Sequence, residues 1–193
     1  MNFKKLSVVF CSLLALTSVM AVSAAETETV SETEAASEEE STASGADEET
    51  EYPITIQHAY GETVIESKPE RIATVGWENQ DTPLALGIAP VGVSGANYGM
   101  VTANNLHPWS VEYFQELGGD APNVFDDVDG LDFEAISDCD PDVILASYSG
   151  LTQEDYNTLS QIAPVIPYKE NAWQTTWRDQ TIENAEGMGM KAE

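Results

Sequence analysis

The chain has 193 residues, of which 34 are acidic and seven basic, so its formal charge at neutral pH is -27. This balance excludes nucleic acid as a partner, because a phosphate backbone requires a basic surface. Hydrophobic residues make up 42% of the chain, which excludes a wholly disordered protein, and the length allows one or at most two small domains.

The first 25 residues have the order of a targeting segment. Two lysines near the start precede an apolar run over residues 6–22, and small residues follow at positions 23–25. This order predicts a secretory signal peptide over residues 1–25. We therefore expect an exported protein, located in the periplasm or at the cell surface. Cys11 lies inside the apolar run and not at its end, which disfavours a lipid anchor.

Residues 26–51 are acidic and lack aromatic rings. They carry 11 acidic side chains and no basic one. Such a segment is predicted to be a disordered, self-repelling linker. Residues 52–193 still hold 23 acidic and five basic side chains, a formal charge of -18. The acidity therefore also belongs to the part that is expected to fold.

The remaining sequence alternates between two periodicities. Residues 52–57 and 62–66 alternate polar and apolar side chains around Gly61, which is typical of a β-hairpin. Short apolar runs of the kind found in buried parallel strands follow at 72–75, 91–93, 143–146 and 165–166. Helical patterns separate them at 81–86, 109–117, 133–137 and 152–162. The alternation predicts an α/β fold, a Rossmann-like parallel sheet with helices on both faces.

In sheets of this kind the ligand binds beyond the carboxyl ends of the strands. The loops predicted at that edge are rich in glycine and aromatic residues. The aromatic residues there are Trp77, Tyr98, Trp109, Tyr148, Tyr168, Trp173 and Trp177. Their concentration on loops favours a recognition surface, with packing into the core as the alternative for any single ring.

Motifs for catalysis and metal binding are missing from the sequence. No glycine-rich phosphate-binding loop follows a predicted strand. His58 and His107 stand 49 residues apart and are expected to be solvated loop residues, so a metal ligated by the protein is not predicted. Cys139 is the only cysteine after the predicted signal peptide, which allows no internal disulfide, and it is expected to be a surface thiol.

The acidic segment at residues 126–132 resembles a calcium-binding loop in composition. Its carboxylates alternate around Gly130, but Ser137 stands where the closing bidentate glutamate of such a loop is required. A surface loop in which Asp132 caps the following helix is the alternative. These acids are also the only candidates for the acid and base of an extracytoplasmic hydrolase, which is a rival to a binding function.

Several segments together resemble the substrate-binding proteins of iron-siderophore ABC transporters, a group that also includes vitamin B12 and haem receptors. The matching segments are KPERIATV at 68–75, NQDTPLALG at 79–87, PVGV at 90–93, GLDFEAI at 130–136, PDVI at 141–144 and WQTTWRD at 173–179. Their order and spacing carry the resemblance, which covers nearly all of residues 52–191.

Members of this family have two α/β lobes joined by a long helix, with the ligand between the lobes. The resemblance implies that residues 52–193 are the N-terminal lobe and include the start of the interdomain helix, the second lobe being absent. It implies a non-enzymatic receptor that delivers a ferric siderophore to an ABC permease and acts as a monomer. Iron is then held by the siderophore, so no cofactor or protein-bound metal is expected.

The resemblance also implies particular site residues. The ligand-binding residues it places at the cleft are Trp77, Asn79, Tyr98, Tyr148, Trp173, Trp177 and Arg178. Indole and phenol rings suit the bulk of a ferric hydroxamate, and a guanidinium can donate to its oxygens. Asp81 matches the acidic residue through which such receptors dock on their permease, with stabilisation of the helix dipole as the alternative role.

The charge of the chain narrows the expected ligand. A lobe near -18 repels a triscatecholate ferric complex, which carries three negative charges, but not a neutral or cationic hydroxamate. We therefore expect a ferric hydroxamate or a mixed hydroxamate-citrate ligand. Cobalamin and haem remain open within the family, with Tyr98 or Tyr148 as an axial ligand of haem. A surface module that binds another protein through its aromatic loops is a further alternative.

Overall fold

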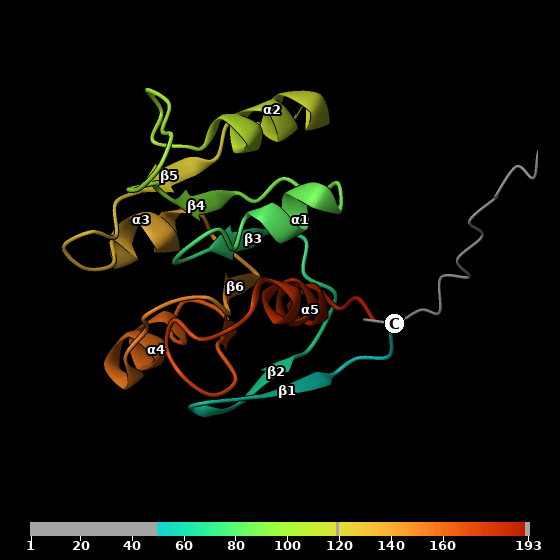
Figure 1. Cartoon of the computed structure of the whole chain (residues 1–193). Helices are drawn as coiled ribbons and strands as arrows, with labels where there is room; N and C mark the ends of the chain where they lie inside the picture. The colour runs from blue at the N-terminus through green and yellow to red at the C-terminus, as the bar shows by residue number, and fades with distance from the viewer. Residues whose placement is uncertain (1–49, 119, 192–193) are drawn as a thin grey trace, which may run out of the picture. The chain divides into compact units, whose positions relative to one another are not determined.

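The computed structural model describes residues 50–118 and 120–191 (Figure 1). The predicted signal peptide and nearly all of the predicted linker lie outside the described residues, so both stay predictions. Within the part that is described, no helix is both long and apolar enough to cross a membrane.

An antiparallel hairpin opens the described chain, as predicted. It consists of β1 (Ile54–His58) and β2 (Gly61–Ile65), with Ile54 opposite Ile65 and His58 opposite Gly61. The inward-facing residues of the alternation are buried against the rest of the fold. His58 is one of them, and its Nε2 lies 2.9 Å from Oγ1 of Thr63. The expectation of a solvated His58 is wrong, because β1 extends through it and its alternation turns the ring inward.

Five parallel strands form the central sheet, in the order β5-β4-β3-β6-β7. Their bounds are β3 (Ile72–Thr74), β4 (Gly92–Ser94), β5 (Asn123–Phe125), β6 (Val143–Ala146) and β7 (Val165–Pro167). All residues of β3, β4, β6 and β7 are buried, which explains their short apolar runs. The edge strand β5 was not predicted, because an exposed asparagine precedes its two apolar residues.

Helices cover both faces of the sheet (Figure 1). They are α1 (Asp81–Ala85), α2 (Pro108–Leu117), α3 (Phe133–Asp138), α4 (Gln153–Leu159) and α5 (Trp177–Gly187). In Figure 1, α1, α2 and α5 lie on one side of the strands, and α3 and α4 on the other. The predicted α/β fold, with a parallel sheet between two helical layers and a hairpin in front of it, is confirmed. The helix expected at the C-terminus is present as α5.

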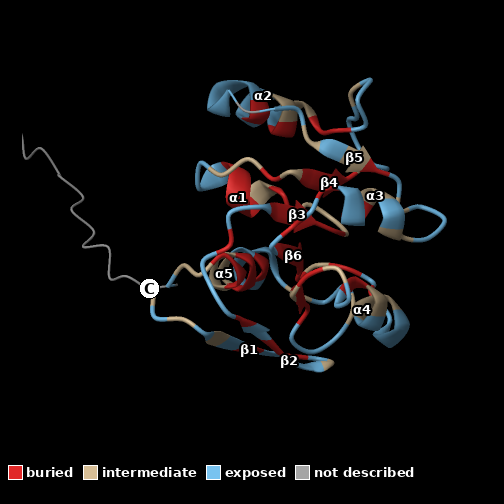
Figure 2. Ribbon diagram, turned by 180° about the vertical axis from the view of Figure 1, so that it is seen from behind, coloured by how far each residue is buried: buried red, intermediate tan, exposed pale blue. Residues whose placement is uncertain are grey.

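The two helical layers are held by alternate residues of the same strands. In β6, Ile144 and Ala146 belong to the core under α3 and α4, whereas Val143 and Leu145 belong to the core shared with the hairpin and the end of α5. Figure 2 shows the strands buried between helices whose outer faces are exposed. Because strand side chains alternate between faces, four successive apolar residues supply both cores.

Cys139 is part of this core and not of the surface. It is 5% exposed, and its thiol donates a hydrogen bond to the carbonyl of Ala135 over 3.2 Å. Burial raises the pKa of the thiol. The expectation of a surface thiol is therefore wrong, because the acidic residues on either side of Cys139 face outward while its own side chain closes the core under α3.

Candidate functional site

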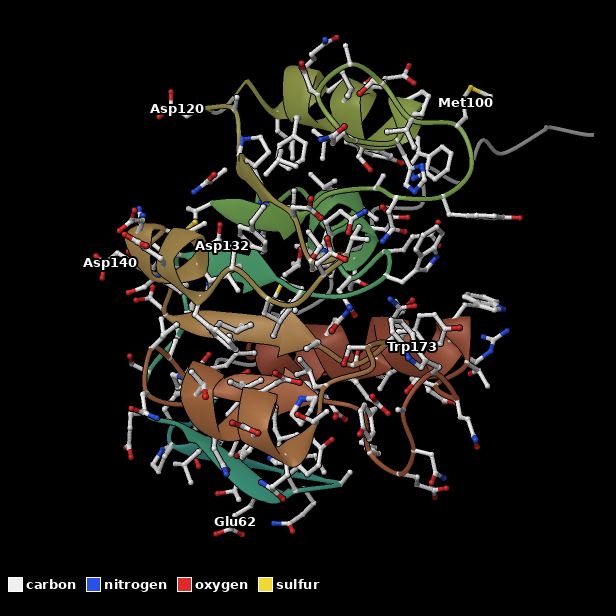
Figure 3. The ribbon with its side chains drawn as sticks, turned by 90° about the vertical axis from the view of Figure 1, so that its left-hand side faces the viewer. Glu62, Met100, Asp120, Asp132, Asp140 and Trp173 are labelled. Atoms are coloured by element: carbon white, nitrogen blue, oxygen red, sulfur yellow. The ribbon has the colours of Figure 1, made fainter. Side chains whose placement is uncertain are left out.

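The sheet order places a crevice between β3 and β6. The chain leaves β3 towards β4 on one side and leaves β6 towards β7 on the other, so the loops after these two strands diverge. Such a reversal of strand order is where open α/β sheets bind their ligands. In Figure 3, the strand arrows point towards the edge that carries Trp173, and Asp140 lies at the opposite end.

The two diverging loops touch before they separate. Gly76 has a φ of +86°, and a Cβ at this position would lie 2.8 Å from the carbonyl oxygen of Tyr148. The backbone nitrogen of Trp77 donates to that same carbonyl over 3.0 Å. Glycine is required at position 76 both by the left-handed conformation and by this close approach. The contact fixes the position of the Trp77 backbone.

Asn79 lies beneath the loops and is completely buried. Its Nδ2 donates to the carbonyls of Val75 and Tyr148, while its Oδ1 accepts from Ser147 and from Gln180 and Asn184 of α5. A side chain whose donors and acceptor are all used inside the fold has no polar atom to offer a ligand. Asn79 was expected to line the site, but it is buried beneath it. It joins the loop after β3, the end of β6 and α5.

An aromatic cluster forms one wall of the site. The ring of Trp77 packs at 6.0 Å from Tyr98 and at 5.7 Å, edge-on, from His107. His107 stacks in turn on Trp109, with ring centroids 4.3 Å apart. Its Nδ1 lies 3.0 Å from the carbonyl of Met100, and only 3% of the residue is exposed. The expected solvated His107 is wrong, because the ring is the buried centre of this cluster.

A second wall is built on Trp173. Its φ is +59°, and its backbone nitrogen donates to the carbonyl of Ser149. The indole lies so close to Gly150 that a Cβ there would come within 2.8 Å of three indole atoms. Tyr148 meets it edge-on at 5.4 Å. About half of Trp173 remains exposed, so the fold anchors one side of the indole and leaves the other side available.

Trp177 and Arg178 lie on the first turn of α5 and contact each other. The Arg178 guanidinium is centred 4.8 Å from the Trp177 ring, a cation-π geometry. Trp177 is 71% exposed. Arg178 forms no ion pair with an acidic side chain among the described residues.

Between the two walls runs a groove of about 510 Å³ at the carboxyl edge of the sheet. Its apolar lining includes Trp77, Trp173, Val128 and Leu131, and its polar lining includes Asn97, Asp127, Ser149 and Asp155. Of the residues expected to bind ligand, Trp77 and Trp173 line this groove directly. Tyr98 and Tyr148 each pack against one of these two indoles, while Trp177 and Arg178 lie outside the lining.

None of the polar side chains that line the groove was predicted from the sequence to bind the ligand. Asn97 follows β4, Asp127 follows β5, and Asp155 lies in the first turn of α4. The loops that hold Asn97 and Asp127 follow strands, which is the signal that could have found these residues. Asp155 lies in a predicted helix and not in a predicted loop, so the strand-end signal could not have found it.

The charge around the groove is uniformly negative. Residues 72–168, which supply most of its lining, contain 15 acidic side chains and no lysine or arginine. The described bases lie before β3 or after β7, and none lines the groove. The negative electrostatic potential of this surface favours a neutral or cationic ligand in the groove over an anionic one.

The acidic segment 126–132 behaves as a loop and helix cap. Oδ1 of Asp132 accepts from the backbone nitrogen of Ala135, and Oδ1 of Asp126 accepts from that of Val128. No group of three or more metal-ligating side chains gathers anywhere in the described ranges. Asp132 is thus the N-cap of α3, and the arrangement gives no support to a calcium site.

Asp81 opens α1 beside the aromatic cluster. Its carboxylate accepts hydrogen bonds from Nε1 of Trp109 at 3.2 Å and from the hydroxyl of Ser110 at 3.5 Å. Burial is the main cause that raises the pKa of Asp81, and the neighbouring Glu78 adds to the effect. The side chain is therefore fixed in place at the N-terminus of its helix.

Comparisons with known proteins agree on one class. A model of the periplasmic binding protein family matches residues 72–193. YhfQ of Bacillus subtilis strain 168, whose name describes an ABC transporter substrate-binding lipoprotein, is 26% identical over 155 residues, which are 79% of this chain and 45% of that protein.

Solved structures extend the comparison. PiaA of Streptococcus pneumoniae TIGR4, in complex with ferrichrome, is 54% identical with a TM-score of 0.69, over 72% of this chain and 45% of PiaA. A periplasmic solute binding protein of Mycobacterium smegmatis is 30% identical with a TM-score of 0.62, over 70% of this chain and 46% of that one. The chain spans about half the length of the relatives it matches.

Proposed function

The chain belongs to the periplasmic binding protein family, and from this premise we propose that it is part of a receptor that binds a ferric siderophore and passes it to an ABC permease for iron uptake. The family consists of substrate-binding transport proteins and not of enzymes. The single observation that supports the siderophore is the likeness, at 54% identity, to PiaA, whose structure holds ferrichrome.

The groove is suited to such a ligand. Trp77 and Trp173 form two indole walls about a space at the sheet edge, and their supporting contacts fix them before any ligand arrives. A ferric hydroxamate presents a bulky, largely apolar surface, which rigid aromatic rings cover at a low cost in side-chain entropy. Tyr98, 75% exposed beside Trp77, offers a further ring.

We propose a hydroxamate as the ligand class on grounds of charge. The groove is lined by two carboxylates and no base, so a ligand with three negative charges is repelled. Arg178, which is stacked on Trp177 and lies outside the groove lining, is proposed as a donor to hydroxamate oxygens. Iron stays inside the siderophore, and the protein contributes rings and hydrogen bonds.

Docking on the permease is proposed for Asp81. It stands at the start of α1, is held by Trp109 and Ser110, and lines no part of the groove. A carboxylate fixed in this way is suited to a basic partner, because its orientation is set before the encounter.

The test of the ligand class is a competition on the native secreted protein. Equilibrium dialysis with radioactive iron carried by ferrichrome, by a ferric triscatecholate and by ferric citrate measures the three affinities under one condition. We expect saturable binding of ferrichrome and none of the triscatecholate. Tight binding of the triscatecholate with ferrichrome ignored would refute the charge argument. Binding of none of the three, nor of a cationic ferric hydroxamate such as ferrioxamine B, would refute the siderophore receptor.

A further inference from the structure

Two carboxylates, Asp127 and Asp155, line the groove that we propose for the ligand. They come from different elements, one from the loop after β5 and the other from the first turn of α4. Both are half-buried, so each is partly shielded from water. Shielding from solvent strengthens the interaction of a charge with a ligand relative to the same charge in bulk water.

Neither carboxylate is neutralised by the protein. No lysine, arginine or histidine of the described residues forms an ion pair with Asp127 or Asp155. The bases nearest in sequence to the groove, Lys169 and Arg178, are occupied elsewhere, the first with Glu183 and Glu186 and the second over the Trp177 ring. A ligand in the groove therefore meets uncompensated negative charge.

Asp155 is held in a fixed orientation. Its Oδ2 accepts hydrogen bonds from the backbone nitrogen of Thr152 at 2.9 Å and from the Thr152 hydroxyl at 2.7 Å, which closes the capping box of α4. One carboxylate oxygen is thus committed to the helix, and the other accepts no hydrogen bond from the described residues. Asp127 makes no hydrogen bond to the described residues that would compete with a ligand.

From this arrangement we propose that the groove selects ferric hydroxamates that carry a protonated amine, with Asp127 and Asp155 as the residues that set the preference. The inference rests on the proposed function and adds the sign of the ligand's charge. The ferric trishydroxamate core is neutral, so a pendant ammonium group decides the net charge of the complex. Trp77 and Trp173 contact the core, and the two carboxylates attract the ammonium group.

The experiment uses two ligands that share one iron core. Ferrioxamine B carries a pendant amine that is protonated at neutral pH, and its N-acetyl derivative lacks that charge. Titration of the native secreted protein with each, followed by tryptophan fluorescence, gives the ratio of the two dissociation constants. We expect ferrioxamine B to bind about two- to fivefold more tightly than the acetylated form, as for a partly exposed ion pair. Raising the salt concentration should shrink the ratio.

Variants assign the preference to the residues. Asp127→Asn should move the ratio towards one, because it removes a charge from the groove lining. Asp129→Asn is the matched control, since it removes the same charge from the same loop at a position outside the lining, and it should leave the ratio unchanged. Asp155→Asn should act as Asp127→Asn does, with circular dichroism to verify that α4 keeps its cap.

The outcomes separate this inference from the proposed function. Equal affinities of the wild-type protein for the two ligands would overturn the inference and leave the receptor intact. A ratio that Asp127→Asn and Asp129→Asn lower equally would also overturn it, because the effect would then come from net charge alone. Failure of both ligands to bind while ferrichrome binds would overturn the inference alone, and failure of all three to bind would contradict the proposed function itself.

Discussion

The indole nitrogen of Trp109 donates a hydrogen bond to Oδ2 of Asp81 over 3.2 Å, so the start of α2 holds the acid that opens α1. The same indole stacks on His107, which packs edge-on against Trp77 in the wall of the groove. The residue proposed to dock on the permease and a residue proposed to bind the ligand thus belong to one packed cluster, although only Trp77 lines the groove.

Replacing Asp81 separates docking from binding. Asp81→Asn keeps the hydrogen-bonding shape but removes the charge, so we expect ligand affinity within twofold of the wild type and iron uptake reduced about tenfold or more, as for the loss of one partner of a buried interfacial charge pair. Uptake of radioactive iron by whole cells and titration of the purified protein measure the two effects. Equal losses of affinity and uptake would remove the docking role.

Gly150 provides a test of Trp173 without touching its indole. A Cβ at position 150 would overlap three indole atoms, so Gly150→Ala should displace Trp173 from the groove wall. We expect a loss of ligand affinity of about 1–2 kcal/mol, similar to that of Trp173→Ala. Gly118→Ala is the control, because a Cβ there meets nothing within 4 Å, although its positive φ adds some strain. Unchanged affinity in both Gly150→Ala and Trp173→Ala would exclude Trp173 from the site.

Asn79 should act on stability. Asn79→Ala leaves the buried donors of Ser147, Gln180 and Asn184 without their shared acceptor, and we expect the free energy of unfolding to fall by about 2–4 kcal/mol. Urea unfolding measures this loss. Asn157→Ala, at an exposed position of α4, should cost less than about 0.5 kcal/mol. Comparable costs for the two variants would contradict the role of Asn79 as a buried junction.

The raised pKa of Glu183 predicts that the free energy of unfolding falls as the pH rises. Burial raises the pKa of this carboxyl to about 7, and its Oε2 has no hydrogen-bond partner. The folded state therefore holds the proton more tightly than the unfolded state, where the pKa is 4.5. Stability contributed by the neutral carboxyl is complete below about pH 4.5 and is lost as the pH rises towards 7.

Glu183→Gln removes this dependence. The amide stays neutral, so the variant should gain stability over the wild type at pH 8 and match it more closely at pH 5. Thermal unfolding at both values measures the difference. Glu170→Gln, an exposed acid in the preceding loop, is the control and should leave the slope unchanged. A wild-type stability that is flat between pH 5 and 8 would contradict a raised pKa for Glu183.

Much of the fold was accessible from local sequence patterns. The four residues of β6 are all apolar, and the helix caps at Asp132 and Thr152 use side chains typical of N-caps, so these elements were predicted within a few residues. The strand β5 was missed because an exposed asparagine precedes its only two apolar residues. Its place in the sheet comes from pairing with β4, which is a tertiary effect.

The site was predicted less completely, because loops carry it. The sequence indicated which rings follow strands, and Trp77 and Trp173 do line the groove. It did not indicate that the polar atoms of Asn79 are all hydrogen-bonded to buried groups. It also did not indicate that two indoles enclose His107. Both arrangements depend on residues that are distant in sequence. Asp127 belonged to an acidic segment considered for calcium binding or hydrolysis, and Asp155 stood among many acids, so only the groove indicates the role proposed for them.

Titration of the native secreted protein with ferrichrome, followed by its tryptophan fluorescence and by calorimetry, tests the central claim most directly. The account predicts saturable quenching at one equivalent of ferrichrome, because two indoles line the proposed site, and loss of most of that quenching in Trp77→Ala and Trp173→Ala. Absence of both heat and quenching with ferrichrome and with ferrioxamine B would contradict a ferric hydroxamate receptor.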